Sequence, residues 1–148
     1  TAIYGGWYGL TGFLLLSRNT FQVEKIKSYD IDPSCEEAAD MLNEYFVWKD
    51  WKFKAFTADC NQLQSEADLV INTSTEHFEG MQWWNNLKEG TRIVVQGNNM
   101  MHDGHTGNAN GLEMFCNQFP VSKEIYRGEL DFKYPTWGFT RYMLIGIK

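Results

Sequence analysis

The chain has 148 residues, a length expected for one domain, which we place over residues 1–148. Its net charge of −6 and the lack of any run of lysines and arginines disfavour nucleic acid as a partner. The three cysteines are scattered, and no apolar run approaches the ~20 residues of a membrane span, so we expect a cytoplasmic protein with reduced thiols that does not engage a membrane.

Strand-like and helix-like segments alternate along most of the chain. The predicted strands are residues 1–5, 22–30, 51–57, 68–72, 91–96, 122–132 and 138–147. The predicted helices are residues 10–17, 33–46, 78–87 and 112–119, and a loop rich in glycine and asparagine covers residues 97–111. Such alternation predicts a parallel sheet with helices on both faces, whereas the two consecutive strands at the end can pair only as a hairpin. The expected fold class is therefore α/β, a doubly wound, mostly parallel seven-stranded sheet with a C-terminal antiparallel hairpin.

Aromatic residues make up 16% of the chain and include six tryptophans. Because such large side chains dominate the energetics of cores, we expect most of the tryptophans in the core or in the wall of a cleft. In the helix predicted over residues 33–46, the spacing places on one apolar side the residues Ala38, Ala39, Met41, Leu42 and Phe46.

Ligands of open α/β sheets bind outside the carboxyl ends of the strands, so the residues after each strand are the candidate site. Gly5-Gly6-Trp7-Tyr8-Gly9 follows the first strand, and its glycines allow a tight turn and a close approach of the backbone to a ligand. The segment is not GxGxxG, which disfavours a nicotinamide dinucleotide. Taken alone, it also fits a simple turn from strand to helix.

Acidic side chains follow the next two strands. Asp30 stands about 20 residues after the glycines, where a carboxylate accepts hydrogen bonds from the ribose hydroxyls of a nucleoside. The alternative is an acid favoured by a helix N-terminus. Asp59, with the backbone of Ala58 and Cys60, suits an adenine amino group, or it is an ordinary turn residue.

In this order, the segments resemble the class I S-adenosylmethionine-dependent methyltransferases over nearly the whole chain. The turn at residues 5–9, the acids Asp30 and Asp59, the strand at residues 67–72 followed by Thr75-Glu76-His77, and the final hairpin carry the resemblance. It implies a Rossmann-like methyltransferase fold, S-adenosyl-L-methionine as cofactor, and methyl transfer to a small molecule or a protein side chain. The cofactor-binding residues that it implies are Gly5, Gly6, Trp7, Tyr8, Gly9, Asp30, Ile31, Asp59, Cys60, Asn72 and Ser74.

The chain departs from the family in several places. Ile3 stands where the family usually has an acid, and Trp7 replaces the middle glycine of its turn. The segment at residues 72–75 replaces the Asn/Asp-Pro-Pro-Tyr motif of enzymes that methylate amino groups of nucleic acids. There is little room for a substrate-binding cap, which favours a small acceptor, a companion domain or a homo-oligomer. A non-catalytic or regulatory binder, a non-methyl transferase and a nicotinamide oxidoreductase on the same scaffold remain alternatives.

All three histidines are expected on the rim formed by the fourth and fifth strands. Because methyl transfer to oxygen or nitrogen requires removal of a proton, we assign the catalytic roles to His77, Glu76 and His102, with a histidine as general base. His105, together with His102 and Asp103, offers a metal-binding alternative, but the spacing within a loop is weak and we predict no metal. A polar surface loop with no chemical role is the remaining interpretation.

Overall fold

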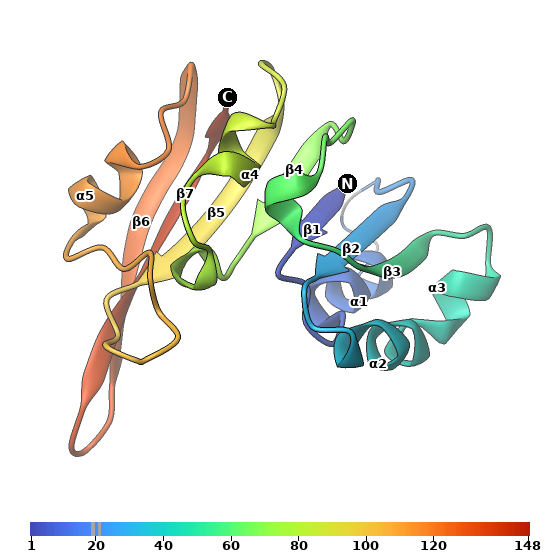
Figure 1. The fold of residues 1–148 in the computed structure, drawn as a ribbon, viewed down its shortest axis with the longest axis horizontal. Helices are drawn as coiled ribbons and strands as arrows, with labels where there is room; N and C mark the ends of the chain where they lie inside the picture. The colour runs from blue at the N-terminus through green and yellow to red at the C-terminus, as the bar shows by residue number, and fades with distance from the viewer. Residues whose placement is uncertain (19, 21) are drawn as a thin grey trace.

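The computed structural model describes residues 1–18, 20 and 22–148. Its strands form one sheet in the order β3-β2-β1-β4-β5-β7-β6 (Figure 1). The strands are β1 (Ala2–Tyr4), β2 (Ile26–Asp30), β3 (Phe53–Thr57), β4 (Leu69–Asn72), β5 (Arg92–Asn98), β6 (Lys123–Lys133) and β7 (Gly138–Ile147). Strands β1 to β5 pair in parallel, and β7 runs antiparallel to both β5 and β6. The predicted fold class, including the C-terminal hairpin, is confirmed.

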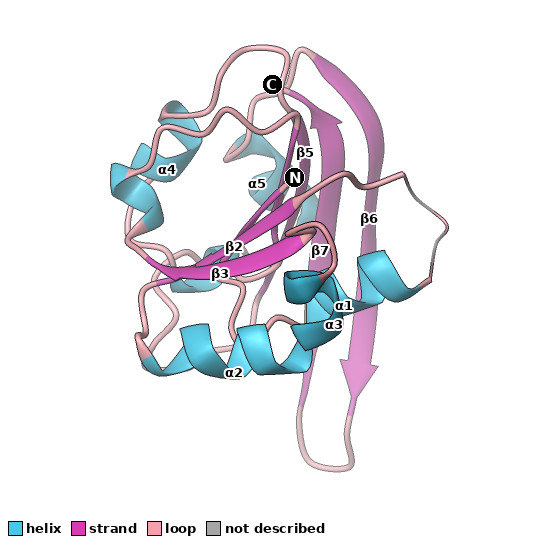
Figure 2. Cartoon of the chain, turned by 90° about the vertical axis from the view of Figure 1, so that its right-hand side faces the viewer, coloured by secondary structure: helices cyan, strands magenta, loops and turns pink. Residues whose placement is uncertain are grey.

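Helices lie on both faces of the sheet. The helices α1 (Leu10–Ser17), α2 (Ser34–Leu42) and α3 (Glu44–Trp48) cover one face, and α4 (Gln82–Asn85) and α5 (Leu112–Asn117) cover the other (Figures 1 and 2). Two 3-10 turns, η1 (Cys60–Gln62) and η2 (Thr75–His77), follow β3 and β4. In the part of the chain that the structure describes, no helix is long and apolar enough to cross a membrane.

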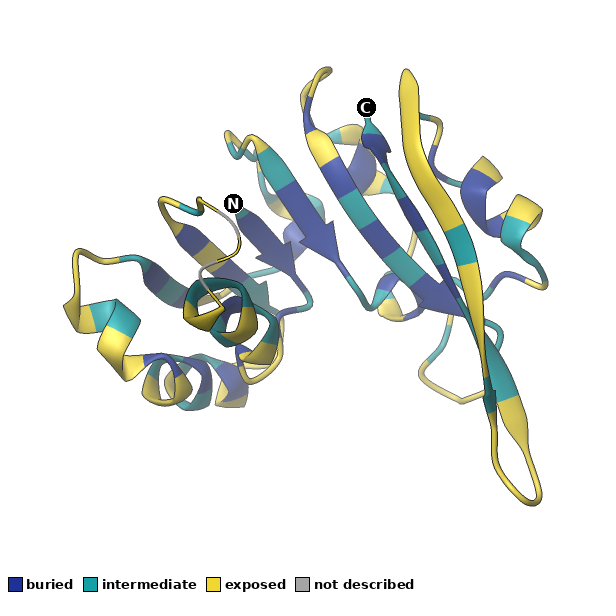
Figure 3. Cartoon of the chain, turned by 180° about the vertical axis from the view of Figure 1, so that it is seen from behind, coloured by how far each residue is buried: buried dark blue, intermediate teal, exposed yellow. Residues whose placement is uncertain are grey.

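Each face of the sheet has its own hydrophobic core. Tyr4 of β1 faces the core beneath α4 and α5, which contains Trp83, whereas its neighbour Ile3 faces the core beneath α1 and α2, which contains Phe53. This division follows from the two-residue period of a strand. The central strands are buried from both sides, while β6 is exposed along most of its length (Figure 3). Complete burial of a side chain such as Phe53 contributes about 1.5–3 kcal/mol.

The helix predicted over residues 33–46 is divided at Asn43, which lies outside helical geometry at φ −102° and ψ 17°. The Asn43 side chain is fully buried, and its Nδ2 donates to the backbone oxygens of Ala39, at 2.9 Å, and Gly9, at 3.1 Å. The buried side of α2 is therefore Cys35 and Ala39, continued by Asn43, at a spacing of four residues. The expected apolar side is wrong for Met41, which is 70% exposed, and for Leu42, which is 43% exposed.

The helix predicted over residues 78–87 shortens to α4, because Gly80 has a φ of 71° that interrupts helical geometry before Gln82. The expectation for the tryptophans holds for half of them. Trp83 and Trp84 are in the core and Trp7 lines a cleft, whereas the other three are at least half exposed. Among those, Trp51 lies in a turn with a positive φ, and Trp137 stacks on other aromatic rings near the hairpin tip.

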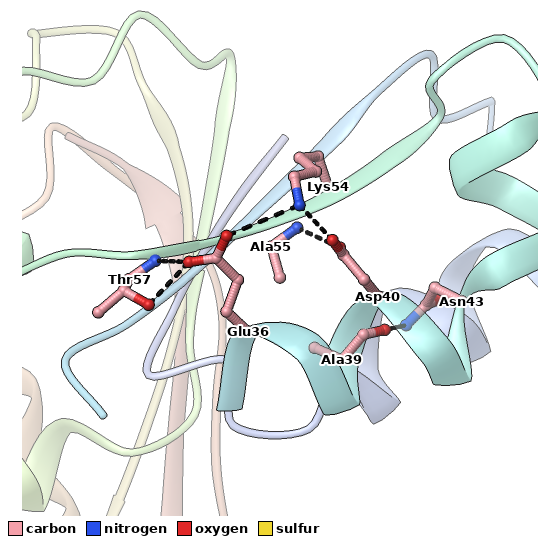
Figure 4. A network of polar contacts seen from close by, with 7 residues as sticks. All are labelled: Glu36, Ala39, Asp40, Asn43, Lys54, Ala55 and Thr57. Atoms are coloured by element: carbon pink, nitrogen blue, oxygen red, sulfur yellow. Dashed lines mark hydrogen bonds and ion pairs between the residues drawn. The ribbon is translucent and has the colours of Figure 1, made fainter. Parts of the chain in front are cut away.

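Strand β3 is an edge of the sheet, and carboxylates of α2 cover its outer side (Figure 4). Glu36 Oε2 accepts hydrogen bonds from the backbone nitrogen and the hydroxyl of Thr57, both at 2.7 Å. Asp40 Oδ1 accepts from the backbone nitrogen of Ala55 at 2.9 Å, and Lys54 pairs with both acids. These bonds satisfy edge groups that would otherwise be open to another strand.

Candidate functional site

A cleft of about 710 Å³ lies along the carboxyl edge of β1, β2, β3 and β4. Gly5 follows β1, Asp30 and Ile31 stand at the end of β2, Ala58 follows β3, and Ser74 lies two residues after β4. The volume falls within the roughly 300–1,000 Å³ of typical small-molecule sites. The position is the one at which open α/β sheets bind ligands.

The carboxylate of Asp30 anchors the turn after β1. Asp30 Oδ2 accepts from the backbone nitrogen of Trp7 at 2.8 Å, and Oδ1 accepts from the backbone nitrogen of Asp32 at 3.0 Å. Trp7 has a φ of 47°, a left-handed conformation that costs a non-glycine residue about 1–2 kcal/mol, so the bond to Asp30 offsets strain in this turn. A carboxylate has about four acceptor positions, which leaves two at Asp30 for a ligand.

The glycines of this turn serve different purposes. Gly5 lines the cleft with a φ of 63°, whereas a Cβ at Gly6 would lie 1.9 Å from Ser28 Oγ. Gly6 thus allows the turn to pack closely against the Ser28 side chain of β2. Trp7 is 65% exposed and stacks on Tyr8 at a centroid distance of 4.6 Å, and the cleft beside it stays open.

Asp59 and Cys60 form the wall of the cleft after β3. Asp59 Oδ1 accepts from the backbone nitrogen of Asn61 at 2.9 Å and caps η1, and its Oδ2 accepts from Gln62 Nε2 at 3.2 Å. Burial raises the pKa of the Cys60 thiol to about 12. The thiol is therefore protonated near neutral pH and is not a nucleophile there.

The end of β4 is shaped by the buried Asn72, whose Oδ1 accepts from the backbone nitrogen of Ser74 at 3.0 Å. Ser74 lines the cleft, and Thr75 Oγ1 donates to the backbone oxygen of Gln96 on β5 at 2.8 Å. These two bonds place η2, and with it His77, at the mouth of the cleft between β4 and β5.

The three histidines lie together on this rim, as the sequence predicts. The ring of His105 is 4.5 Å from that of His77 and 5.3 Å from that of His102, measured between centroids. His77 is exposed and lines the cleft, whereas Glu76 is 3% exposed. The Nδ1 atom of His77 bonds the backbone oxygen of Gly104 at 3.2 Å, so a backbone carbonyl orients this ring.

Of the predicted cofactor-binding residues, seven line the cleft: Gly5, Trp7, Asp30, Ile31, Asp59, Cys60 and Ser74. Hydrogen bonds that shape the surrounding backbone involve Gly6, Gly9 and Asn72, and Tyr8 stacks on Trp7. Of the two other predicted catalytic residues, Glu76 is buried beside His77 in η2, and His102 lies in the loop after β5. Lining residues outside the prediction are Ala58, Asn61, Phe78 and Glu79. Ala58 and Asn61 closely follow the strand predicted over residues 51–57, so position along the chain was the available signal for them. Phe78 and Glu79 begin the helix predicted over residues 78–87, which gave no such signal.

No protein-family profile and no curated protein sequence matches this chain. Solved structures do. The N-methyltransferase NodS from Bradyrhizobium japonicum WM9 superposes with a TM-score of 0.70 at 13% identity, over 99% of this chain and 85% of that one. The YcgJ protein from Bacillus subtilis gives a TM-score of 0.71 at 12% identity, over 99% and 90% of the two chains.

The magnesium protoporphyrin IX methyltransferase ChlM from Synechocystis PCC 6803, solved with bound S-adenosylmethionine, gives a TM-score of 0.65 at 10% identity. That superposition covers 98% of this chain and 68% of ChlM. The chain therefore has the Rossmann-like fold of the class I S-adenosylmethionine-dependent methyltransferases. At identities this low, the comparison establishes the fold, and the site must be argued from its own residues.

Proposed function

We propose that this protein is an S-adenosylmethionine-dependent methyltransferase whose acceptor is a small molecule or a protein side chain. The observation that carries the proposal is the cleft at the carboxyl edge of the sheet, with Asp30 anchored beside a glycine that lets the backbone approach a ligand. NodS and ChlM are methyltransferases that were solved with S-adenosylhomocysteine or S-adenosylmethionine, and they share this fold.

The residues of the cleft fit a nucleoside with a charged amino-acid tail. Asp30 keeps acceptor positions for two ribose hydroxyls, and Ile31 beside it is 71% exposed and offers an apolar surface for the base. Asp59 lines the cleft after β3, and its carboxylate would accept a hydrogen bond from the adenine amino group. Gly5 lines the cleft beside Phe78 and Ser74, and the methionine end would lie along its backbone. Ile3, which replaces the acid of the family, is buried in the core under α1 and α2 and takes no part.

The chain's own residues would then position the acceptor and take up its proton. When bound, the cofactor supplies an electrophilic methyl group on a sulfonium. His77 stands at the mouth of the cleft, and the bond of its Nδ1 to Gly104 leaves Nε2 as the atom that can accept a proton. Phe78 adds an apolar wall that limits water at the reacting centre. Most of the rate enhancement would come from holding the reactants in line.

Calorimetric titration of the intact protein with S-adenosylhomocysteine, with NADH in parallel, tests the cofactor. We expect binding in the micromolar range, which corresponds to about −8 kcal/mol, and no heat with NADH. Binding of NADH alone would refute the proposal in favour of an oxidoreductase. Binding without transfer of labelled methyl to any lysate fraction would identify a non-catalytic binder.

A further inference from the structure

Three metal-ligating side chains converge behind the mouth of the cleft. Glu76 and His77 come from η2, His105 comes from the loop after β5, and one potential ligand atom from each lies within 4.8 Å of the other two. Of the three, only His77 also lines the cofactor cleft, and an ion held by its Nε2 would take the place of the proton-accepting role proposed above for that atom. Glu76 and His105 have no part in the proposed cofactor site.

Glu76 is a buried carboxylate with one oxygen left over. Its Oε1 accepts a hydrogen bond from Asn98 Nδ2 on β5. Its Oε2 is buried and has no hydrogen-bond partner among the residues that the structure describes. An unpaired carboxylate oxygen is costly to bury, and a cation or a proton is needed to compensate it. The adjoining imidazoles favour a metal cation.

Both histidines are held in the same tautomer, with one nitrogen free. The Nδ1 atom of His77 bonds the backbone oxygen of Gly104 at 3.2 Å, and the Nδ1 atom of His105 bonds that of Met100 at 2.8 Å. Because a carbonyl oxygen only accepts, each Nδ1 must carry the proton, which leaves the Nε2 lone pair of the neutral ring available. Histidines that bind metals are oriented by outer partners in this way.

His102 provides the contrast within the same loop. Its Nδ1 accepts a hydrogen bond from the backbone nitrogen of Gly104 at 3.3 Å, so the proton of its neutral ring is on Nε2. Its side chain is exposed and is not part of the converging group. The arrangement separates His105 from His102, which sequence spacing alone treats as equivalent.

The backbone fixes the loop against η2. The backbone nitrogens of Thr106 and Gly107 both donate to the backbone oxygen of Glu76, at 2.8 and 3.0 Å. A Cβ at Gly107 would lie 2.7 Å from the backbone oxygen of Thr75, so a glycine permits this approach. The two segments that carry the three side chains are thus joined independently of any ion.

We propose that Glu76, His77 and His105 bind a divalent transition-metal ion, with Zn²⁺ as the best match to two imidazoles and one carboxylate. Ligand bonds of about 2.0–2.2 Å place tetrahedral ligand atoms about 3.4 Å apart. The three atoms now lie within 4.8 Å of one another, so the group closes by up to about 1.4 Å on binding. Three protein ligands leave one position open for water or for another ligand. His77 also lines the cleft, so that position is near the methyl acceptor. This last point rests on the proposed function, whereas metal binding does not.

The test uses the full chain, stripped with a chelator and titrated with Zn²⁺ against a chromophoric competitor. We expect one ion per chain. Glu76→Gln, His77→Ala and His105→Ala should each weaken Zn²⁺ binding at least about 10-fold, whereas His102→Ala should leave it unchanged. Glu76→Gln keeps the shape and the bond to Asn98, and circular dichroism of each metal-free variant verifies folding.

Zn²⁺ binding that is equally weak in the parent and in His105→Ala, or that falls as much in His102→Ala, would overturn the site. Titration of the same samples with S-adenosylhomocysteine separates the two proposals. Zn²⁺ binding without S-adenosylhomocysteine binding refutes the methyltransferase and supports the metal site. S-adenosylhomocysteine binding without Zn²⁺ binding supports the methyltransferase and refutes the metal site.

Discussion

Replacement of Asp30 by alanine tests the centre of the proposed cofactor site. The change removes two hydrogen bonds from backbone nitrogens, those of Trp7 and Asp32. Hydrogen bonds to a charged group contribute about 1.5–3 kcal/mol each when buried, but both of these are at the exposed surface. After solvent screening, we expect the free energy of unfolding to fall by about 1–2 kcal/mol in total.

The effect on ligand binding should be larger. A carboxylate that accepts from two ribose hydroxyls in a cleft contributes about 3 kcal/mol or more, and each 1.4 kcal/mol is a factor of ten. Asp30→Ala should therefore weaken S-adenosylhomocysteine binding more than about 100-fold. Loss of the anchor on Trp7, whose φ is 47°, adds to this by releasing the turn.

Asp32→Ala is the matched control. Asp32 Oδ1 accepts from the backbone nitrogen of Ser34 at 2.9 Å at the start of α2, and loss of such a bond costs about 1 kcal/mol. Both variants should therefore unfold at lower urea concentration, and only Asp30→Ala should lose affinity in calorimetry. If Asp30→Ala binds S-adenosylhomocysteine within threefold of the parent, or if both variants lose affinity equally, the ribose role of Asp30 is refuted.

Three further predictions concern the scaffold. The bonds from the Thr57 hydroxyl and backbone hold the pKa of Glu36 below 4.5, so its stabilisation is complete above that pH and is lost as the pH falls through the lower folded pKa. Glu36→Gln should flatten the acid limb of melting temperature against pH, and an unchanged limb would contradict this. The Cys60 thiol, with a pKa raised by burial to about 12, should resist iodoacetamide at neutral pH until urea is added, and rapid labelling of the native protein by mass spectrometry would show otherwise. Lys148 Nζ donates to the backbone oxygens of Trp84 and Leu87, so Lys148→Met should lower the urea midpoint by the equivalent of about 1–2 kcal/mol without changing the slope.

The position of the cleft could be predicted from the sequence because it depends on chain order. Alternating strands and helices determine a parallel sheet, and its carboxyl edge determines where Asp30 and Ser74 must stand. The anchoring of Trp7 by Asp30 was not predictable, because it depends on a left-handed φ in a residue that rarely adopts one. The apolar residues between Pro33 and Phe46 predict a helix, but only the packing of Asn43 against Gly9 reveals where it ends.

The histidine rim shows the same limit. Its location follows from the neighbouring positions of β4 and β5, which the fold class already requires. The difference between His105 and His102 depends on which loop backbone groups face each ring, and a loop without a repeating pattern carries no sequence signal for that.

The place of β7 in the sheet has a consequence for the order in which the protein can form. Strand β7 is the last of the described strands in sequence, yet it lies between β5 and β6. During synthesis, β1 to β4 and the cleft residues at their ends emerge early, while the outer edge of β5 remains without a partner until residues 138–147 are made. A chain stalled before β7 would thus already carry all the residues that line the cleft, while the outer edge of β5 is still open and apolar. Such a species is prone to aggregation, so it depends on rapid completion of the chain or on a chaperone.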